Sequence, residues 1–266
     1  MPVLNKEAVL LAVKGALALG CMINRRSSFD RKHYFYKDLP SGYQITQQYR
    51  IPPQSGLKLT KEPLAVSGSV PVNPTDDTTG QLTLAFILGI TRVQLEQDTA
   101  KTTSIPINGK EEATALLNQA PLSQFLIDHN RSSIPLIEII TPPILRTPAE
   151  AAAAFAKVAE ILRAAGVTTG DLHWGALRCD VNVSLGLNSP RTEIKNLFSV
   201  TAVREATRYE IEEQVRMYEM NVPIEASTKS WDGVAARFIR AKKGDKDYRY
   251  IHRPASNVFD RALMSE

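Results

Sequence analysis

The residues best suited to chemistry in this 266-residue chain alternate with apolar residues between Arg178 and Ser184. In an extended strand, successive side chains point to opposite faces of the sheet. Arg178, Asp180 and Asn182 therefore share one face, and the residues between them, which include Cys179, share the other. We expect the apolar face to pack and the polar face to carry chemistry.

The same alternation occurs upstream, where Arg92, Gln94, Glu96 and Asp98 alternate with apolar or neutral residues. A polar strand face is often simply solvated, so either strand alone is weak support for a ligand site. Two such faces in one chain favour a site more than either does alone.

Glu138 lies inside the otherwise apolar segment 134–140. Burial of an ionised carboxylate is costly unless a metal ion or a cation compensates it. Two interpretations are open from this segment: a structural ion pair with an arginine such as Arg131, or ligation of a metal.

Four acidic residues therefore lie at the centre or end of predicted strands, namely Glu96, Asp98, Glu138 and Asp180. If the strands are neighbours, these carboxylates converge into the oxygen cage that Mg²⁺ prefers, with nucleotide phosphates completing the coordination. Compensating positive charge for phosphoryl transfer would come from Arg31, Lys32, Arg131, Arg178 and Lys195. The chain has no Walker A loop and no Gly-rich dinucleotide fingerprint, so ATP chemistry would need a site on a sheet.

The segment 29–36 places two basic residues among four aromatic ones. It is compatible with an ordinary edge strand, or with a surface where an RNA base stacks beside cations that bind phosphate. His33 within it is expected to pack rather than to catalyse.

The elements that must position these residues can be read from local signals. Asn5 is a candidate cap for a helix that ends near Gly20, and Thr147 followed by Pro148 predicts a second helix that ends at Gly166. Residues 29–50 predict two strands around a turn at 38–42.

Ser199 is expected to begin a third helix that runs to about Tyr218, with an inward stripe of Val203, Thr207, Ile211, Val215 and Tyr218. Helices and strands do not alternate in a regular βαβ rhythm. We therefore predict an α+β fold, with a mostly antiparallel sheet and flanking helices.

Composition excludes several classes of protein. With 43% hydrophobic and 23% charged residues, the chain is typical of a soluble globular protein, and its apolar runs are too short to span a bilayer. Its two cysteines cannot form a disulfide framework or a zinc site alone. The net charge of +4 permits an anionic partner, and the basic run from Arg237 to Arg253 could contact phosphate.

Several motifs, in order, resemble the B subunits of aspartyl/glutamyl-tRNA amidotransferases. They are 29–36 with 42–45, 128–139, 177–184, 191–197 and 247–250. The resemblance covers nearly the whole chain. It implies one catalytic domain over residues 1–266, with the cradle-shaped fold grouped with glutamine synthetase and guanido kinases. It also implies that the family's N-terminal strand region and its C-terminal helical and tail domains are absent.

The resemblance implies a ligase that uses ATP and Mg²⁺ to phosphorylate glutamate misacylated on tRNA(Gln). Ammonia from a glutamine-hydrolysing amidase subunit then forms Gln-tRNA(Gln), in a hetero-oligomer with a small accessory subunit. Carried over by position, the metal ligands are Glu96, Glu138 and Asp180, with His173 as a further candidate, and the nucleotide and acyl site contains Lys32, Arg178, Asn182 and Lys195. Arg31, Arg131 and Arg249 would bind the cofactor.

Gln97, in place of a second acid beside Glu96, resembles mitochondrial members more than bacterial ones, so we expect a mitochondrial matrix protein, with the bacterial cytoplasm as the alternative.

Two other functions are open. One is an inactive remnant that still docks on its partner protein. The other is a basic RNA-binding module, which would leave the acidic residues unexplained.

Overall fold

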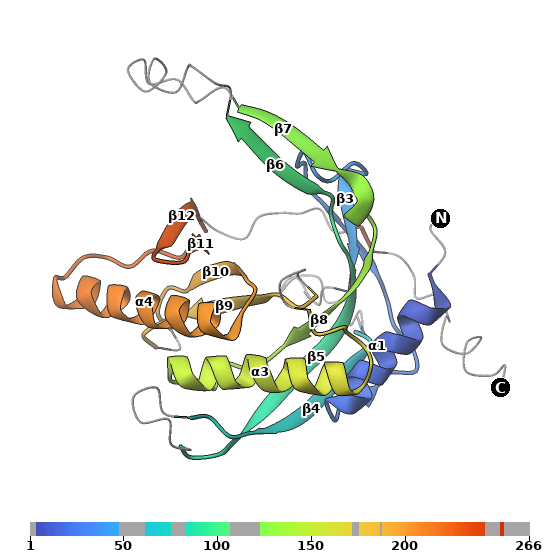
Figure 1. Cartoon of the computed structure of the whole chain (residues 1–266), viewed down its shortest axis with the longest axis horizontal. Coiled ribbons are helices and arrows are strands. Elements are labelled where there is room, and N and C mark those ends of the chain that lie inside the picture. The colour runs from blue at the N-terminus through green and yellow to red at the C-terminus, as the bar shows by residue number, and fades with distance from the viewer. Residues whose placement is uncertain are drawn as a thin grey trace, which may run out of the picture. The chain divides into compact units, whose positions relative to one another are not determined.

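The computed structural model describes residues 4–47, 62–75, 83–106, 123–171, 176–186, 188–242 and 251–252, with only the backbone for 104–106, 123–124 and 251–252. Contacts within the chain divide it into two compact units. Figure 1 labels many of the helices and strands named below. Unit 1 comprises residues 1–23, 65–92 and 139–246, and unit 2 comprises 24–64, 93–138 and 247–266. Each unit is therefore assembled from segments that are far apart in the sequence.

The helices described in unit 1 begin at the residues predicted to cap them. Asn5 accepts the N–H of Ala8 at 3.1 Å, and the side chains of Thr147 and Ser199 accept N–H groups in the same way. Each cap satisfies one of the N–H groups that a first helical turn leaves without a partner. The helices are α1 (Lys6–Ala18), α3 (Pro148–Ala164) and α4 (Val200–Glu219).

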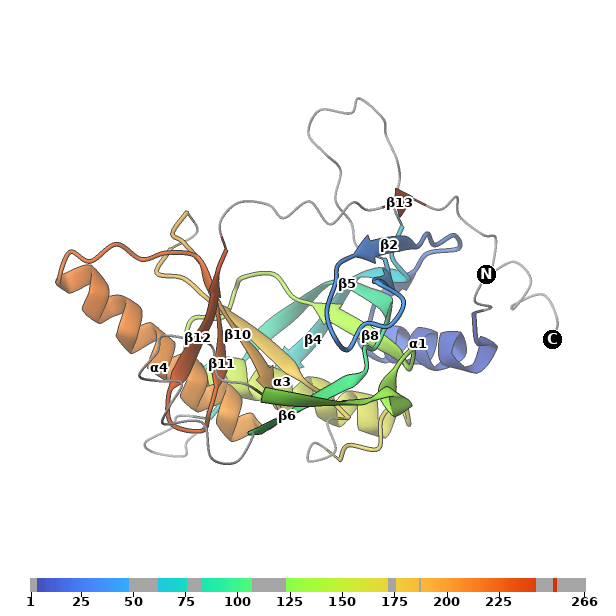
Figure 2. The same ribbon diagram turned by 90° about the horizontal axis from the view of Figure 1, so that it is seen from above.

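A four-stranded sheet in unit 1 has the order β12-β11-β10-β9. Strands β10 and β11 are parallel, and the other two pairs are antiparallel. The sheet's apolar side meets α3 and α4 in a core that includes Phe155, Ile194, Leu197, Val203 and Ala206 (Figure 2). The strands are β9 (Cys179–Val183), β10 (Thr192–Leu197), β11 (Ser227–Trp231) and β12 (Ala236–Ala241).

The buried stripe of α4 differs from the predicted one. Val203 and Thr207 are buried as expected, but the stripe continues through Glu210 and Gln214, whereas Tyr218 is 72% exposed. Glu210 is accommodated because the Nζ of Lys229 in β11 lies 2.7 Å from its carboxylate and the Gln214 amide donates to it at 2.8 Å. The apolar pattern alone predicted the wrong buried positions, because Glu210 can be buried only when a partner from a strand distant in the sequence contacts it.

Unit 1 also contains β1 (Met22–Ile23), β4 (Ala65–Val72) and the first part of β5 (Phe86–Gln97). These strands lie in the order β1-β4-β5, and β8 (Pro135–Ile140) pairs with β5. Strands β5 and β8 each pass from one unit into the other.

Unit 2 contains the end of β5 followed by β3 (Tyr43–Thr46), β2 (Asp30–His33) and β13 (Ile251–His252). The predicted hairpin around 38–42 is confirmed, with β2 antiparallel to β3. Of the two interpretations left open for the segment 29–36, the ordinary edge strand is wrong, because β13 pairs with the other side of β2. A two-stranded ribbon of β6 (Lys101–Pro106) and β7 (Ser123–Asp128) precedes the short helix η1 (His129–Arg131).

Helices and mostly antiparallel strands confirm the predicted α+β class. None of the helices in the described ranges has both the length and the apolar character needed to cross a bilayer.

Candidate functional site

One face of the four-stranded sheet in unit 1 is polar. Strand register places Asn182 opposite Glu193, Glu193 opposite Thr228, and Thr228 opposite Arg240. Residues directly opposite each other on neighbouring strands share a face. We call this surface the polar sheet face; it comprises Asp180, Asn182, Glu193, Lys195, Thr228 and Arg240.

The alternation predicted for β9 is confirmed. Asp180 and Asn182 are exposed, whereas Cys179 and Val181 pack against the hydrophobic core. Burial, reinforced by the charge of Asp180, raises the pKa of the Cys179 thiol to about 12. The thiol therefore stays protonated at neutral pH, and a protonated thiol is a poor nucleophile.

Glu193 lies at the centre of the polar sheet face. Its carboxylate is 2.9 Å from the Nζ of Lys242 and 3.6 Å from the Nζ of Lys195, and the Thr228 hydroxyl donates to it at 3.3 Å. Burial opposes ionisation, but the hydrogen bond from Lys242 and the charges of Lys195 and Lys242 outweigh it and lower the pKa of Glu193. Glu193 is therefore a fixed negative charge between two cations.

Lys195 is held by a second carboxylate, that of Asp180. Its Nζ lies 3.1 Å from Asp180 Oδ2, and the other oxygen, Oδ1, accepts the backbone N–H of Asn196 at 3.0 Å. Burial lowers the pKa of Lys195, but the charges of Asp180 and Glu193 outweigh burial and raise it above its ordinary value. Lys195 is therefore a permanent cation of this face.

A second polar cluster forms in unit 2, at the end of β5. The buried side chain of Gln94 donates to Glu138 Oε2 at 2.5 Å. Glu138 itself is exposed, so the expectation of a buried carboxylate in β8 is wrong. Its strand is apolar in sequence, but the Glu138 position faces outward and is not part of the core.

Arg131 does not pair with Glu138, the partner considered from the sequence. Its Nη2 and Nε lie 2.7 and 3.0 Å from Asp98 Oδ2, and the Asp98 side chain is only 10% exposed. This two-point contact joins the end of β5 to η1. Arg131 therefore neutralises a carboxylate of its own unit.

Glu96 is another predicted metal ligand and also belongs to unit 2. It lies opposite Thr46 of β3. Among the residues that the structure describes, no group of three or more His, Cys, Asp or Glu side chains is placed to hold a metal ion. Glu96 and Glu138 belong to unit 2 and Asp180 belongs to unit 1. A metal shared by all three stays a prediction.

The basic and aromatic segment of unit 2 forms a series of stacked contacts. The Arg31 guanidinium lies 4.6 Å from the Tyr43 ring centre, and Lys32 Nζ lies 5.4 Å from that of Tyr34. The Tyr34 hydroxyl donates to Gln44 at 2.9 Å. Cation–π contacts of this kind orient both side chains from β2.

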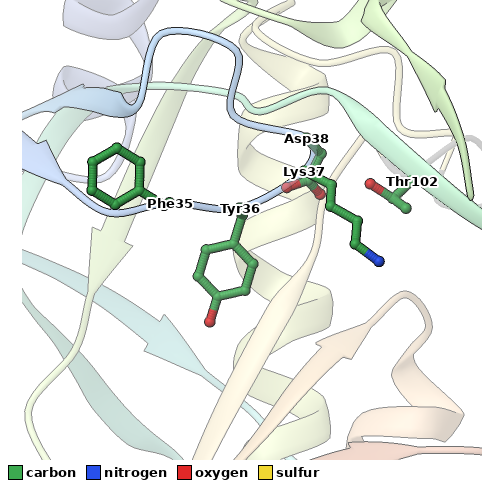
Figure 3. Close-up of a pocket in the computed structure, with 5 residues that line it drawn as sticks. All are labelled: Phe35, Tyr36, Lys37, Asp38 and Thr102. Atoms are coloured by element: carbon green, nitrogen blue, oxygen red, sulfur yellow. The ribbon is translucent and has the colours of Figure 1, made fainter. Parts of the chain in front are cut away.

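The loop after β2 borders an open hollow of about 530 Å³. It is lined by Phe35, Tyr36, Lys37, Asp38 and Thr102, and Figure 3 shows Tyr36 and Lys37 extending from the same loop. The Phe35 side chain is 92% exposed. This hollow was not predicted, because its walls come from β6 as well as from the aromatic segment.

Comparison with known proteins decides the family. The model of the GatB/GatE catalytic domain matches residues 1–260. The chain belongs to the GatB/GatE catalytic-domain family. It is 36% identical to the B subunit of the mitochondrial glutamyl-tRNA(Gln) amidotransferase of Yarrowia lipolytica over 95% of this chain, and 38% identical to those of Candida albicans and Paracoccidioides brasiliensis over 94% and 95%. The chain spans 40–45% of the length of these relatives.

Two of the site residues predicted for this GatB/GatE-family chain, His173 and Arg249, lie outside the described residues. Of the others, the structure brings Asp180, Asn182 and Lys195 together on the polar sheet face and places the half-buried Arg178 just before β9. Lys32, Arg31, Arg131, Glu96 and Glu138 belong to unit 2.

Sequence reasoning missed Glu193, Thr228 and Lys242 as members of the site. The alternation of Glu193 with Lys195 in β10 was a signal that could have identified the first. Thr228 and Lys242 gave no such signal, because only the pairing of β11 with β10 and the position of the chain after β12 bring them to Glu193.

Proposed function

We propose that this chain is the catalytic part of the B subunit of a glutamyl-tRNA(Gln) amidotransferase. The proposed reaction is ATP-dependent phosphorylation of the glutamate carried by Glu-tRNA(Gln), followed by amidation to Gln-tRNA(Gln). The observation that carries the proposal is the polar sheet face, with its fixed cations, in a chain that belongs to the GatB/GatE catalytic-domain family.

The chemistry requires activation because a carboxylate is a poor acceptor of nucleophiles. In the first step a carboxylate oxygen attacks the γ-phosphorus of ATP and ADP leaves. In the second step the nitrogen of ammonia attacks the acyl carbon, and phosphate leaves with the bonding electrons. Both steps develop negative charge, which positioned cations stabilise. On the described surface, Lys195 and Arg178 are the proposed cations, and Asn182 offers an amide beside them.

Mg²⁺ is the proposed metal, and it would shield the phosphate oxygens of ATP. Exposed or half-exposed carboxylates are the ligands that suit this ion. Glu138 fits this requirement, since it is exposed and Gln94 contacts only its Oε2. Glu96 is half-buried and is the second proposed ligand in unit 2. Lys32 and Arg31, oriented by Tyr34 and Tyr43, are the proposed contacts of unit 2 with nucleotide or tRNA phosphate.

The proposed partners are a glutamine-hydrolysing amidase subunit that supplies ammonia and a small accessory subunit. The substrate would be Glu-tRNA(Gln). The relatives named above are mitochondrial proteins, and we propose the mitochondrial matrix as the location of this chain.

The test is reconstitution of the amidotransferase complex with the full-length protein that contains this chain. With ATP, Mg²⁺, glutamine and Glu-tRNA(Gln), it is expected to form Gln-tRNA(Gln). Glu138→Gln should lower the rate at fixed Mg²⁺ by tenfold or more, roughly the effect of losing one metal ligand, whereas the exposed Glu160→Gln on α3 should leave it unchanged. Absence of product from the unaltered complex would reject the proposal.

A partner-binding role without catalysis is the second candidate. It is favoured because Arg131 and Lys195, two predicted ligand-binding cations, are engaged by Asp98 and Asp180 of the same units. Titration calorimetry separates the two functions: a catalytic protein binds ATP in a Mg²⁺-dependent manner, and a purely structural one does not.

A further inference from the structure

An extra residue in β10 decides what the polar sheet face presents. Ile194 lies opposite Val181, but Leu197 lies opposite Cys179, so three steps along β10 match two steps along β9. Strand β10 therefore contains a β-bulge in which Lys195 and Asn196 both lie opposite Asp180. A bulge interrupts the regular alternation and changes the direction of a side chain.

The burial pattern shows the consequence of the bulge. Ile194 and Leu197 are both buried, and the two residues between them, Lys195 and Asn196, are both at least partly exposed. With Ile194 in the core, strict alternation would have buried Asn196 and exposed Leu197. The bulge thus keeps two consecutive polar residues out of the core and returns Leu197 to it.

One residue of the bulge has an unfavourable backbone conformation, and its N–H group is bound by a side chain. Asn196 has a φ of +62°, a left-handed conformation that asparagine tolerates better than most residues. Its N–H donates to Asp180 Oδ1 at 3.0 Å, while Asp180 Oδ2 lies 3.1 Å from Lys195 Nζ. One carboxylate therefore contacts both residues of the bulge.

We infer that Asp180 is a positioning residue that fixes the Lys195–Asn196 bulge, and that it is not a ligand of the metal ion. Both of its oxygens are engaged, one by a cation and one by a backbone N–H. A metal ion bound to Asp180 would lie beside the Lys195 ammonium, and the two positive charges would repel each other. The role of Lys195 and Asn196 toward ATP or the acyl group rests on the proposed function, but the fixation of the bulge does not.

Two variants of Asp180 separate its two contacts. Asp180→Asn keeps an oxygen that can accept the Asn196 N–H and removes the charge beside Lys195. Asp180→Ala removes both contacts. Asp232→Asn is the matched control, because Asp232, which lies between β11 and β12, also accepts backbone N–H groups and pairs with a cation, Arg237, but is not part of the bulge.

Hydrogen exchange of the Asn196 amide, measured by mass spectrometry with single-residue fragmentation on the reconstituted complex, tests the bulge directly. Asp180→Ala should accelerate this exchange by about tenfold or more, as expected for loss of a charge-assisted hydrogen bond. Asp180→Asn and Asp232→Asn should leave it nearly unchanged. Unchanged exchange in Asp180→Ala would overturn the inference, whether or not the complex makes Gln-tRNA(Gln).

Activity measurements distinguish a positioning residue from a metal ligand. Asp180→Asn should raise the KM for ATP by about tenfold, because Lys195 loses its fixed orientation. The Mg²⁺ concentration for half-maximal activity should stay within about twofold of that of the unaltered complex, whereas loss of a ligand raises it by roughly tenfold or more. A rise of that size in the Mg²⁺ requirement would show that Asp180 binds the metal. An inactive unaltered complex would reject the proposed function and leave the exchange measurement to decide the role of Asp180.

Discussion

The polar sheet face depends on individual carboxylates whose charge is fixed by neighbouring cations. Glu193 illustrates this, because two lysines and one hydroxyl contact a side chain that is only 17% exposed. A carboxylate that is stabilised in its charged form makes folding depend on pH. The contribution of Glu193 to the pH dependence of stability can therefore be measured with a variant of this one residue.

Glu193→Gln should reduce stability at neutral pH. The lowered pKa of Glu193 in the folded state means that its stabilising effect is complete above the unfolded-state pKa and is lost as pH falls through the folded-state pKa. We expect a loss of about 1–3 kcal/mol at pH 7, typical of hydrogen bonds to charged groups. Denaturant unfolding at pH 7 and at acidic pH measures both values.

The difference between Glu193→Gln and the unaltered chain should shrink at acidic pH, because both side chains are then neutral. The exposed Glu225→Gln, in the segment before β11, is the control and should change little at either pH. A difference that stays constant with pH would contradict the assignment of Glu193 as a fixed charge.

The Gln47 side chain connects three described segments of unit 2. Its buried Oε1 accepts the N–H of Leu95 at 2.8 Å and that of Leu64 at 3.2 Å, and its amide donates to Ser27. Gln47→Leu would leave two buried N–H groups without a partner. We expect a loss of about 2–5 kcal/mol, with faster hydrogen exchange at Leu64 and Leu95. Normal exchange at both amides would show that other groups replace the glutamine.

At the scale of an element, α4 is attached to its sheet by a buried ion pair as well as by apolar contacts. Glu210 is 1% exposed in its side chain and Lys229 is 16% exposed, with 2.7 Å between their charged atoms. A buried pair contributes little net stability, but removal of one partner leaves an uncompensated charge. The two residues therefore act as a unit.

Lys229→Met should destabilise unit 1 by about 3–5 kcal/mol, because the Glu210 charge stays buried without its cation. The double variant Lys229→Met with Glu210→Leu should recover most of this loss, since no buried charge remains. Chemical denaturation of the two single variants and the double variant measures the coupling. Additive losses would mean that the two side chains do not interact.

Helix ends and strand faces could be predicted because they depend on neighbouring residues. The caps at Asn5, Thr147 and Ser199 and the alternation in β9 are determined locally, and all are confirmed. The stripe of α4 was predicted one residue out of register beyond Thr207 because the partners of Glu210 and Gln214 lie on β9 and β11. The exposed position of Glu138 was missed for a similar reason, since a run of apolar residues does not reveal which side of a strand faces the core.

At the scale of the whole molecule, each polar cluster depends on segments from distant parts of the sequence that one compact unit brings together. Unit 1 joins residues 1–23, 65–92 and 139–246, and unit 2 joins residues 24–64, 93–138 and 247–266. Register within a sheet, such as the bulge opposite Asp180, is a property of this assembly and has no local signature. The same holds for Thr228 and Lys242, which reach Glu193 only through strand pairing and the path of the chain after β12.

The division into two units predicts that a destabilising substitution in one unit accelerates hydrogen exchange more in that unit than in the other. Regions with separate sets of contacts open as separate cooperative units, with different free energies. Lys229→Met removes a contact within unit 1, so it should accelerate exchange at Ile194 and Val203 by about tenfold or more. Leu64 and Leu95 of unit 2 should change much less.

Gln47→Leu provides the reciprocal measurement, with large effects on exchange in unit 2 and small ones at Ile194. Equal acceleration in both units by either variant would mean that the chain unfolds as a single cooperative body. The prediction that the two units open separately would then be wrong.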